Sequence, residues 1–550
     1  MNYFKFAALI GFSAVAFTSC NEDNNGKDTP KDLGEDAQYY KSAVGNFTAE
    51  EWLPGGELGT TDNVTESSYQ DATPAVEEQG LDMAFNFGEQ IFERTYNQNQ
   101  PPFNGLGPAW VRQACITCHP AYGHGKRQND YKANTYGNGY LLVIFDKDTE
   151  AFCPEVTGMP QTKAAEPFKA PIDEDQIKVE WKVATDGDTP LRFPDGETYE
   201  LIYPEVTIPQ QAFNTDPKPS NYAVRIESTI GIPGTGLLDA IPEADIKAQY
   251  AEETSHGAQL NPAIWTGSDW NPTTGLYTLA DGTKAVKRYT YGLTRASLQD
   301  GPGANAVWNI TNVTRGDRTK LYTTEAWALA MSEDEEVIRK IQADPTSPYY
   351  ADGTVNGIKN AIRVLLSPKT DQTNNSVKRF DPEMADEDFY NLMVWHRGLA
   401  IPRARGLQRT EVQRGKELFY QMGCTNCHRP SWKTGSDDYW APENIKKTGK
   451  LPKYANQTIY PYSDLIQHRL FMKNDIRTGW CRTTPLWGRG LSLINTGAEG
   501  RLHDVRARNE VEAIMWHCYS KKSDAYNSAM KFYNLPKADR DAVVEFLRAI

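Results

Sequence analysis

Residues 115–119 read CITCH and residues 424–428 read CTNCH, so the chain carries the same arrangement of cysteine and histidine twice. Two thiols three residues apart can add to the two vinyl groups of a haem, and the adjoining imidazole can reach the iron. A cysteine pair alone would also fit a zinc half-site or a redox dithiol, but the histidine after both pairs favours haem. We therefore expect two covalently bound haem c groups. The attachment residues are Cys115, Cys118, Cys424 and Cys427, and the proximal ligands are His119 and His428.

The first twenty residues have the pattern of an export signal. Lys5 precedes an apolar run over residues 6–17, which is too short to span a bilayer as a mature helix. The run ends in small residues before Cys20, as in the lipobox of bacterial lipoproteins, so we expect Cys20 to be lipidated; cleavage elsewhere, leaving Cys20 free, is the alternative. Haem attachment by this motif also occurs outside the cytoplasm. We expect a lipid-anchored protein outside the inner membrane of a bacterium, in the periplasm or at the outer membrane.

The charge balance limits the classes of partner. The chain has 58 basic and 72 acidic residues, which gives a formal net charge of −14. Such an acidic surface argues against binding to nucleic acid or to anionic lipid. It is compatible with a small redox partner protein that carries positive charge.

Helical spacing appears before each cysteine motif, after a first segment of different composition. Residues 21–75 are rich in Asp, Glu, Asn, Gly and Thr, and we expect them to form a flexible tether. Residues 82–96 have the spacing of an amphipathic helix. A second helix is expected from Thr410, with Thr410 and Gln413 as a capping box. Its apolar face would consist of Val412, Gly415, Leu418, Phe419 and Met422.

The two helices share a short echo, GEQIF at residues 88–92 and GKELF at residues 415–419, each ahead of a cysteine motif. We interpret this echo as an internal repeat, in which each copy is a small helical haem domain. Each copy also needs a closing helix, and residues 386–399 and 539–550 have the required apolar stripe.

More than 250 residues separate His119 from the first closing helix, far more than one haem domain needs. Residues 140–145, 176–184 and 198–208 are β-branched or aromatic runs separated by turn signals, so this insertion is expected to be partly β. It could shape a substrate cleft or brace the haem domains.

Several further segments resemble one known family. They are residues 105–108, 236–242, 459–468, 482–488, 502–504 and 512–517. Together they resemble the di-haem oxidoreductase family once labelled thiol oxidoreductases, which is related to bacterial di-haem cytochrome c peroxidases. The resemblance covers about residues 81–550. It implies a mainly α fold with two cytochrome c-like domains, residues 76–405 with an insertion at about 130–300, and residues 406–550.

The resemblance also implies a sixth ligand for the second haem. His517 falls on the position of that ligand in the peroxidase relatives, so we expect His428 and His517 to be the axial pair. Met515 is the alternative, although two residues along a helix it points to a different face. His503 and His468 match family positions too, and near the porphyrin they would hold propionates or order the loop.

The first haem has no equally convincing distal ligand, as an open peroxide site requires. The segment 298–313 looks like the distal loop of the relatives, in which a carboxylate and a glutamine assist cleavage of the O–O bond. Asn309 falls at the carboxylate position, with Gln299 and Asp300 nearby, and an asparagine cannot carry a proton as a carboxylate can. His124 could instead cap the iron.

Two tryptophans and three remaining cysteines complete the candidates. Trp110 and Trp487 could carry an electron between the haems, as a tryptophan does in the relatives, or could be packing residues. Cys481 and Cys518 are expected to form a disulfide in an oxidising compartment, with Cys153 left over. Calcium is an additional candidate cofactor.

Three functions follow from these observations. The main hypothesis is a peroxidase-like di-haem oxidoreductase that reduces hydrogen peroxide, or uses it to oxidise a small-molecule substrate, with electrons passed from the C-terminal to the N-terminal haem. The alternative is a di-haem electron-transfer lipoprotein without peroxidase activity. A third hypothesis is a haem-bearing binding or scaffold protein in which the long insertion is the functional part.

Overall fold

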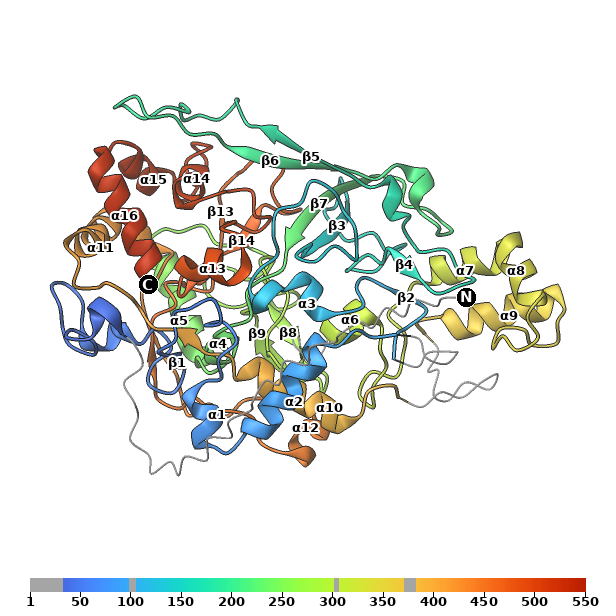
Figure 1. The fold of residues 1–550 in the computed structure, drawn as a ribbon. Coiled ribbons are helices and arrows are strands. Elements are labelled where there is room, and N and C mark those ends of the chain that lie inside the picture. The colour runs from blue at the N-terminus through green and yellow to red at the C-terminus, as the bar shows by residue number, and fades with distance from the viewer. Residues whose placement is uncertain (1–32, 98–104, 301–305, 370–381) are drawn as a thin grey trace, which may run out of the picture.

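The computed structural model describes residues 33–97, 105–300, 306–369 and 382–550. Helices predominate over short strands, so the fold is mainly α (Figure 1). The strands pair as two-stranded sheets, β1 with β10, β2 with β4, β3 with β7, β5 with β6, β8 with β9, β11 with β12 and β13 with β14.

The helices are α1 (Pro74–Glu78), α2 (Asp82–Glu93), α3 (Cys115–Cys118), α4 (Thr235–Asp239), α5 (Glu243–Ser255), α6 (Ala306–Thr311), α7 (Glu325–Glu333), α8 (Glu335–Gln342), α9 (Val355–Leu366), α10 (Asp386–Arg397), α11 (Thr410–Met422), α12 (Glu443–Thr448), α13 (Ser492–Thr496), α14 (Glu510–Trp516), α15 (Tyr526–Tyr533) and α16 (Lys537–Ala549). The strands are β1 (Thr60–Thr61), β2 (Ala109–Trp110), β3 (Tyr140–Asp146), β4 (Lys163–Ala164), β5 (Lys178–Val183), β6 (Ile202–Thr207), β7 (Tyr222–Ser228), β8 (Leu276–Thr278), β9 (Lys284–Val286), β10 (Ile401–Pro402), β11 (Trp432–Lys433), β12 (Thr458–Ile459), β13 (Gln467–Arg469) and β14 (Trp480–Arg482).

Two helix pairs organise the molecule, and they repeat one arrangement. Helix α2 packs across α10, and α11 packs across α16, at separate places in the molecule (Figure 1). At each crossing a glycine of the first helix, Gly88 or Gly415, meets the backbone of the second. The crossings therefore agree with the predicted repeat of an opening and a closing helix around each cysteine motif.

The predicted helices are confirmed, but one cap is wrong. The apolar face expected for α11 is buried in the structure. Helix α11 begins at Thr410 with Arg409 as the N-cap, and no side chain caps it. Gln413 donates its amide to the carbonyl groups of Leu407 and Gln408 instead, so the predicted capping box does not form.

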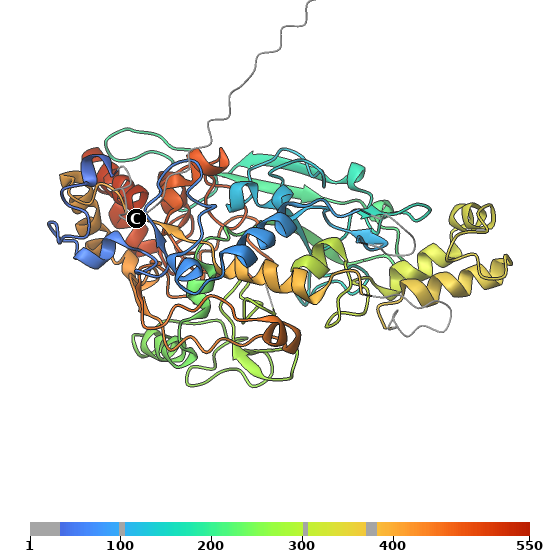
Figure 2. The same ribbon diagram turned by 60° about the horizontal axis from the view of Figure 1, so that its bottom comes forward.

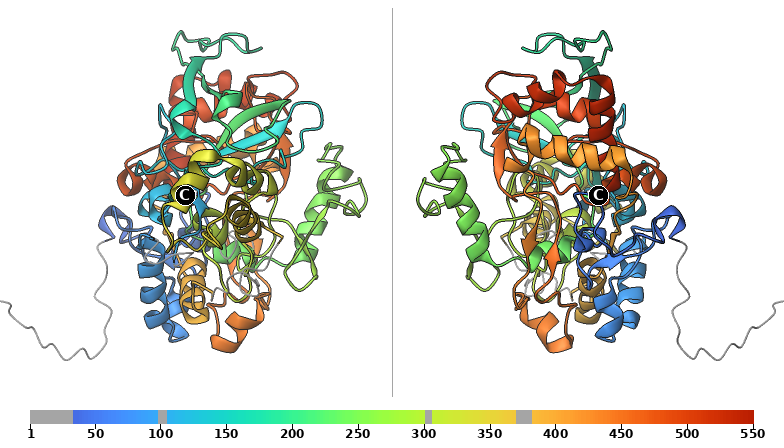
Figure 3. Two further views of the ribbon diagram at one scale, coloured as in Figure 1. Left: turned by 90° about the vertical axis from the view of Figure 1, so that its right-hand side faces the viewer. Right: turned by 90° about the vertical axis from the view of Figure 1, so that its left-hand side faces the viewer.

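The segment between the two helix pairs is partly β, as expected. The three predicted runs become β3, β5 and β6, and β3 pairs with β7 over its whole length. Helices α7 to α9 form a small cluster with its own core, which stands away from the body at one end (Figure 2). The segment containing α5 stands out at one side (Figure 3).

Residues 33–75 are packed against the body, which corrects the tether expected from their composition. Phe47 and the fully buried Trp52 enter a core cluster with Phe419 and Phe546. β1 adds a short parallel pair with β10. A few aromatic residues placed at contact points outweigh the polar average of this segment.

Cys20 and the predicted signal lie outside the described residues. Within the described ranges, no helix combines the length and the hydropathy needed to cross a bilayer.

Candidate haem sites

The second cysteine motif opens into a cavity in the C-terminal part of the chain. The cavity, together with its opening to solvent, has about 1510 Å³ of space outside the protein atoms. Cys424, Cys427 and His428 lie in its wall together with His517. Apolar side chains cover much of the remaining wall, among them Phe419, Leu470, Met472, Leu486, Leu502, Ile514 and Leu547. This combination of attachment thiols, imidazoles and apolar lining is what a covalently held porphyrin requires.

The imidazole rings of His428 and His517 face one another across this cavity. Their ring centres are 6.4 Å apart, and the ring planes are inclined by 45°. Two metal–nitrogen bonds of about 2 Å, each extended by about 1 Å from the nitrogen to the ring centre, give a separation of about 6 Å. The two rings are therefore spaced for one metal ion between them, in agreement with the predicted axial pair.

Hydrogen bonds orient both rings for ligation. Nδ1 of His428 lies 3.0 Å from the carbonyl oxygen of Tyr462, and Nδ1 of His517 lies 2.7 Å from that of Ala513. Each Nδ1–H donates to a carbonyl, which leaves Nε2 as the basic nitrogen, as in most metal-bound histidines. Burial lowers the pKa of His428 to about 4 and also lowers the pKa of His517. Both rings are therefore neutral and able to bind iron at pH 7.

The alternative ligand Met515 lies outside this cavity. Its side chain is fully buried in the core formed around α14 and α15. His517 follows α14 as its C-cap, and its ring reaches the cavity wall. The turn of the helix therefore separates the two side chains in the direction expected.

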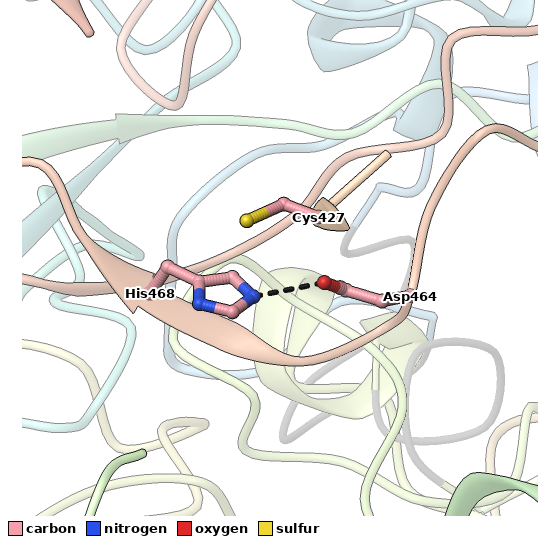
Figure 4. A group of neighbouring side chains, drawn as sticks. All are labelled: Cys427, Asp464 and His468. Carbon is pink, nitrogen blue, oxygen red and sulfur yellow. Dashed lines mark hydrogen bonds and ion pairs between the residues drawn. The ribbon is translucent and has the colours of Figure 1, made fainter. Parts of the chain in front are cut away.

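His468 and His503 both line the same cavity, at its polar side. Nε2 of His468 is 2.8 Å from the carboxylate of Asp464, and the Cys427 thiol lies beside them (Figure 4). Nε2 of His503 is 3.6 Å from Asp504 and is deeply buried. These carboxylates tie both imidazoles to the cavity wall, which suits the loop-ordering role expected of them.

The burial and the hydrogen bonds of Arg482 indicate whether the cavity can hold a haem. Its side chain is 3% exposed, Nε donates to the carbonyl of Thr290, and Nη1 is buried without a hydrogen-bond partner. Arg489 lines the cavity beside it and donates to the carbonyl of Gly500, and among the described residues neither guanidinium forms an ion pair with a carboxylate. A buried guanidinium is costly without an anion. Haem propionates would supply that anion, so the residues present fit the group.

The predicted disulfide between Cys481 and Cys518 is wrong, because both thiols are free in the structure. Cys481 faces the haem cavity from β14. Cys518 is buried in the core beyond His517, where its thiol donates to the carbonyl of Met515. Cys153 is also a free, buried thiol.

The first cysteine motif opens into a second cavity with the same local geometry. Cys115, Cys118 and His119 line about 1060 Å³ of space. The rings of Phe92 and His119 are 6.0 Å apart at 56°, the same values that relate Phe419 to His428. Nδ1 of His119 lies 3.2 Å from the carbonyl of Gly123, and burial lowers the pKa of His119 to about 4.

Glu227 projects into this N-terminal cavity and was not predicted. Leu141 on β3 pairs with Glu227 on β7, and directly opposed residues share one face of a sheet. The alternate residues Leu142 and Ile226 enter the core on the other face. Burial raises the pKa of Glu227 to about 7, while a backbone N–H of Tyr291 donates to its carboxylate and acts in the opposite direction. The sequence signal was a charged residue inside an apolar alternating strand.

The three predicted distal residues do not lie at one site in the structure. Asn309 lines the N-terminal cavity, and its buried Oδ1 lacks a hydrogen-bond partner. Gln299 instead donates to Asp239 and to the carbonyl of Trp440, and Asp300 pairs with Arg318. Neither appears in the wall of the cavity formed by the described residues. Their side chains serve a buried polar network, whereas Asn309 is placed to contact a bound molecule.

Two further side chains in the N-terminal cavity were missed by sequence reasoning. His396 on α10 and Met159 both line it. Burial, followed by the neighbouring His119, lowers the pKa of His396 to about 3. His396 lies in a predicted closing helix, next to the aromatic residue that packs on α2, so its position in the cavity wall could have been noticed.

A third cavity of about 640 Å³ lies between the other two. It shares Ile230 with the N-terminal cavity, and Arg482 and Arg489 with the C-terminal cavity. Trp487 lines this space and also belongs to a buried core cluster, so its position is compatible with both of the roles considered for it.

Trp110 and His124 are placed differently from the roles considered for them. Trp110 packs beside the core that contains α2 and α10, and it lines none of these three cavities. His124 lines the third cavity rather than the N-terminal one, and its Nε2 contacts the carbonyl of Gly500. His124 is therefore not placed to cap the N-terminal iron.

Calcium receives no support from the described residues. The grouping with metal-ligand spacing there consists of Cys427, Asp464 and His468 (Figure 4). Calcium prefers six to eight oxygen ligands, which a thiol and an imidazole do not supply. Cys427 is also the predicted thioether to haem, so this grouping is better explained as part of the haem-cavity wall.

Residues 368–550 match the family model described as "Di-haem oxidoreductase, putative peroxidase". No curated protein matches the chain. The matched segment contains the second cysteine motif and His517, and the family is the one that the sequence motifs resemble. The match supports a general assignment as a di-haem oxidoreductase with haem as the cofactor.

Proposed function

We propose that this protein is a peroxidase-like di-haem c oxidoreductase with two cytochrome c-like domains. It reduces hydrogen peroxide, or uses it to oxidise a small molecule, with electrons passed from the C-terminal to the N-terminal haem. The observation that carries the proposal is the difference between the two cavities. One holds the opposed imidazoles of His428 and His517, and the other holds the imidazoles of His119 and His396 together with the Glu227 carboxyl group, whose pKa is about 7.

The C-terminal residues favour electron transfer without substrate binding. His428 and His517 would occupy both axial positions of a haem held through Cys424 and Cys427. Cationic groups of Arg482 and Arg489 would neutralise propionates at the side that faces the third cavity. A site closed in this way keeps its ligands during electron transfer, so little rearrangement opposes it.

The N-terminal residues favour peroxide chemistry. When bound, a haem at His119 would supply iron that can bind a peroxide oxygen and accept or release electrons. Glu227 can take the proton from the first peroxide oxygen and return it to the second, which then leaves as water. Two electrons and two further protons complete the conversion of hydrogen peroxide to two water molecules. Asn309 can hold the peroxide through its unpaired amide oxygen, an acceptor for the peroxide O–H.

His396 and Met159 favour the rival electron-transfer function. Either side chain lines the N-terminal cavity, and either has a nitrogen or sulfur atom that binds haem iron. A six-coordinate N-terminal haem would leave no position for peroxide. The two functions therefore differ in one measurable property, the coordination of that haem.

Peroxide turnover by the purified protein with both haems attached tests the proposal. Ascorbate with a redox mediator supplies electrons, and consumption of hydrogen peroxide and of donor is recorded. We expect two electrons to be used for each peroxide, at a rate far above that of an equal amount of a free haem peptide. A rate no higher than the haem peptide would contradict peroxidase function.

For location and partners, the proposal retains the lipid anchor at Cys20 and a periplasmic or outer-membrane position. The acidic surface, with its net charge of −14, would attract a cationic electron carrier. The association rate of such a carrier should fall as ionic strength rises.

A further inference from the structure

A segment from the middle of the chain reaches across to the C-terminal haem site. Residues 184–201, which connect β5 to β6 and which we call the arm, extend over α14 and α15 at the top of the molecule (Figure 1). Four buried side chains, Ala184, Phe193, Leu201 and Tyr203, join the core that surrounds α14 to α16. The arm and the start of β6 are therefore part of the C-terminal core, although they belong to the insertion.

The arm supplies hydrogen-bond partners to the backbone just after His517. The Thr189 hydroxyl donates to the carbonyl of Cys518 at 2.6 Å, and the backbone N–H of Asp188 donates to that of Tyr519 at 2.7 Å. In return, the backbone N–H of Lys521 donates to the Asp188 carboxylate at 2.6 Å.

These contacts fix the turn that follows α14. The helix ends at Trp516 with His517 as the C-cap, and backbone N–H groups of this turn donate to the carbonyl groups of Met515 and Trp516. The carbonyl groups of the turn itself, on Cys518 and Tyr519, accept hydrogen bonds from the arm. Thr189 is 7% exposed, so loss of its hydroxyl would leave a buried carbonyl unpaired.

The arm is itself fixed at both ends of this contact. Arg540 on α16 pairs with Asp195 and Glu197, and its guanidinium lies 3.9 Å from the centre of the Phe193 ring. At the other end the Tyr519 hydroxyl donates to Asp186, which also pairs with Lys473. A fixed arm can hold the following turn in one position.

We propose that the arm is a positioning element for the sixth ligand of the C-terminal haem, with Thr189 and Asp188 as its positioning residues. The insertion of the N-terminal half thereby sets how firmly His517 binds iron in the C-terminal half. This proposal rests on the axial pair of the proposed function. It gives the insertion a role that its sequence did not reveal.

Displacement of His517 by cyanide tests the proposal in the haem-loaded protein. Cyanide first saturates the haem with the open position, and the slower second phase reports release of His517. The double variant T189V/D188A removes the hydrogen bond from Thr189 to the Cys518 carbonyl and the one from the Lys521 N–H to the Asp188 carboxylate. It should speed the second phase by about threefold to tenfold for each of these hydrogen bonds. T189S keeps the hydroxyl and should restore the wild-type rate at that position.

Thr198→Val is the matched control, because Thr198 is an exposed residue of the same arm. It should leave the second phase unchanged. An unchanged second phase in T189V/D188A, with both haems attached, would overturn the positioning role. The same conclusion would follow if T189S accelerated the second phase as much as T189V/D188A does, because the hydroxyl group would then have no effect on the release of His517.

Failure of the arm proposal can be told apart from failure of the axial pair. If the wild-type low-spin signal survives His517→Gly, the axial pair is wrong and the arm has no ligand to position. If that signal depends on His517 but the rate of the second cyanide phase is the same in T189V/D188A as in the wild-type protein, the arm proposal alone fails.

Discussion

Gly88 lies so close to Asn391 that a Cβ atom placed on the glycine would stand 2.1 Å from the asparagine carbonyl oxygen. At the other helix crossing, a Cβ on Gly415 would stand 2.0 Å from the carbonyl oxygen of Ala542. Backbone atoms cannot move aside as a flexible side chain can. Each crossing thus needs a glycine, which explains why this residue opens the echo that precedes both cysteine motifs.

Gly88→Ala and Gly415→Ala should each push one helix crossing apart. We expect each variant to destabilise the protein by about 1–3 kcal/mol or more, measured by denaturant unfolding of the haem-loaded protein. Gly316→Ala is the control, because its Cβ would meet its nearest atom at 3.6 Å, an ordinary contact. Wild-type stability in both crossing variants would show that the crossings are looser than described.

His517→Gly should convert one low-spin haem to a high-spin or newly ligated form and leave the other spectrum unchanged. The ring of His517 is spaced for a shared iron with His428, and its removal deletes a nitrogen ligand. Met515→Leu, a change of similar volume in the core, should preserve the low-spin signal. Loss of the signal in Met515→Leu but not in His517→Gly would reverse the assignment of the ligand.

Glu227→Gln should lower peroxide turnover by about 10²–10⁴-fold while both haems stay attached, because the amide cannot accept a proton. Gln299→Leu is a useful comparison, since Gln299 lies outside the N-terminal cavity and should affect stability more than turnover. Turnover that persists in Glu227→Gln would assign the proton transfer to another group.

The pH dependence of turnover follows from the same carboxyl group. Burial raises the pKa of Glu227 to about 7, so the group is protonated and unable to accept a proton below that pH. Turnover should therefore rise as pH increases through about 7 in the wild-type protein. The inflection should vanish in Glu227→Gln, and an inflection retained there would come from a different residue.

Cys20→Ser should release the protein from the membrane fraction with both haems still attached, since lipidation and haem attachment use different thiols. Fractionation of cells, with haem staining of each fraction, measures the outcome. Recovery of Cys20→Ser entirely in the membrane fraction would refute anchoring through this residue.

The sequence alone predicted those features that depend on local spacing. The two cysteine motifs, helices α2, α10, α11 and α16 and the strand runs are each legible within a short window. His517 was reached through resemblance, and its position facing His428 agrees with that expectation.

The features that were missed depend on contacts between distant segments. Glu227 reaches the N-terminal cavity only because β7 pairs with β3 in one register. Trp52 makes residues 33–75 part of a core that is completed by residues far along the chain. The absence of a bond between Cys481 and Cys518 could not be foreseen from spacing, because only the fold places the Cys518 thiol in a core and the Cys481 thiol in a cavity wall.

Low-temperature EPR of the oxidised, haem-loaded protein tests the central claim most directly. The two cavities differ in their axial residues, so we expect one low-spin haem with two histidine ligands and one high-spin haem. The low-spin signal should disappear in His517→Gly, and the high-spin signal should shift when peroxide or cyanide is added. Two low-spin signals, with both haems still six-coordinate after partial reduction, would contradict the peroxidase account and favour an electron-transfer protein.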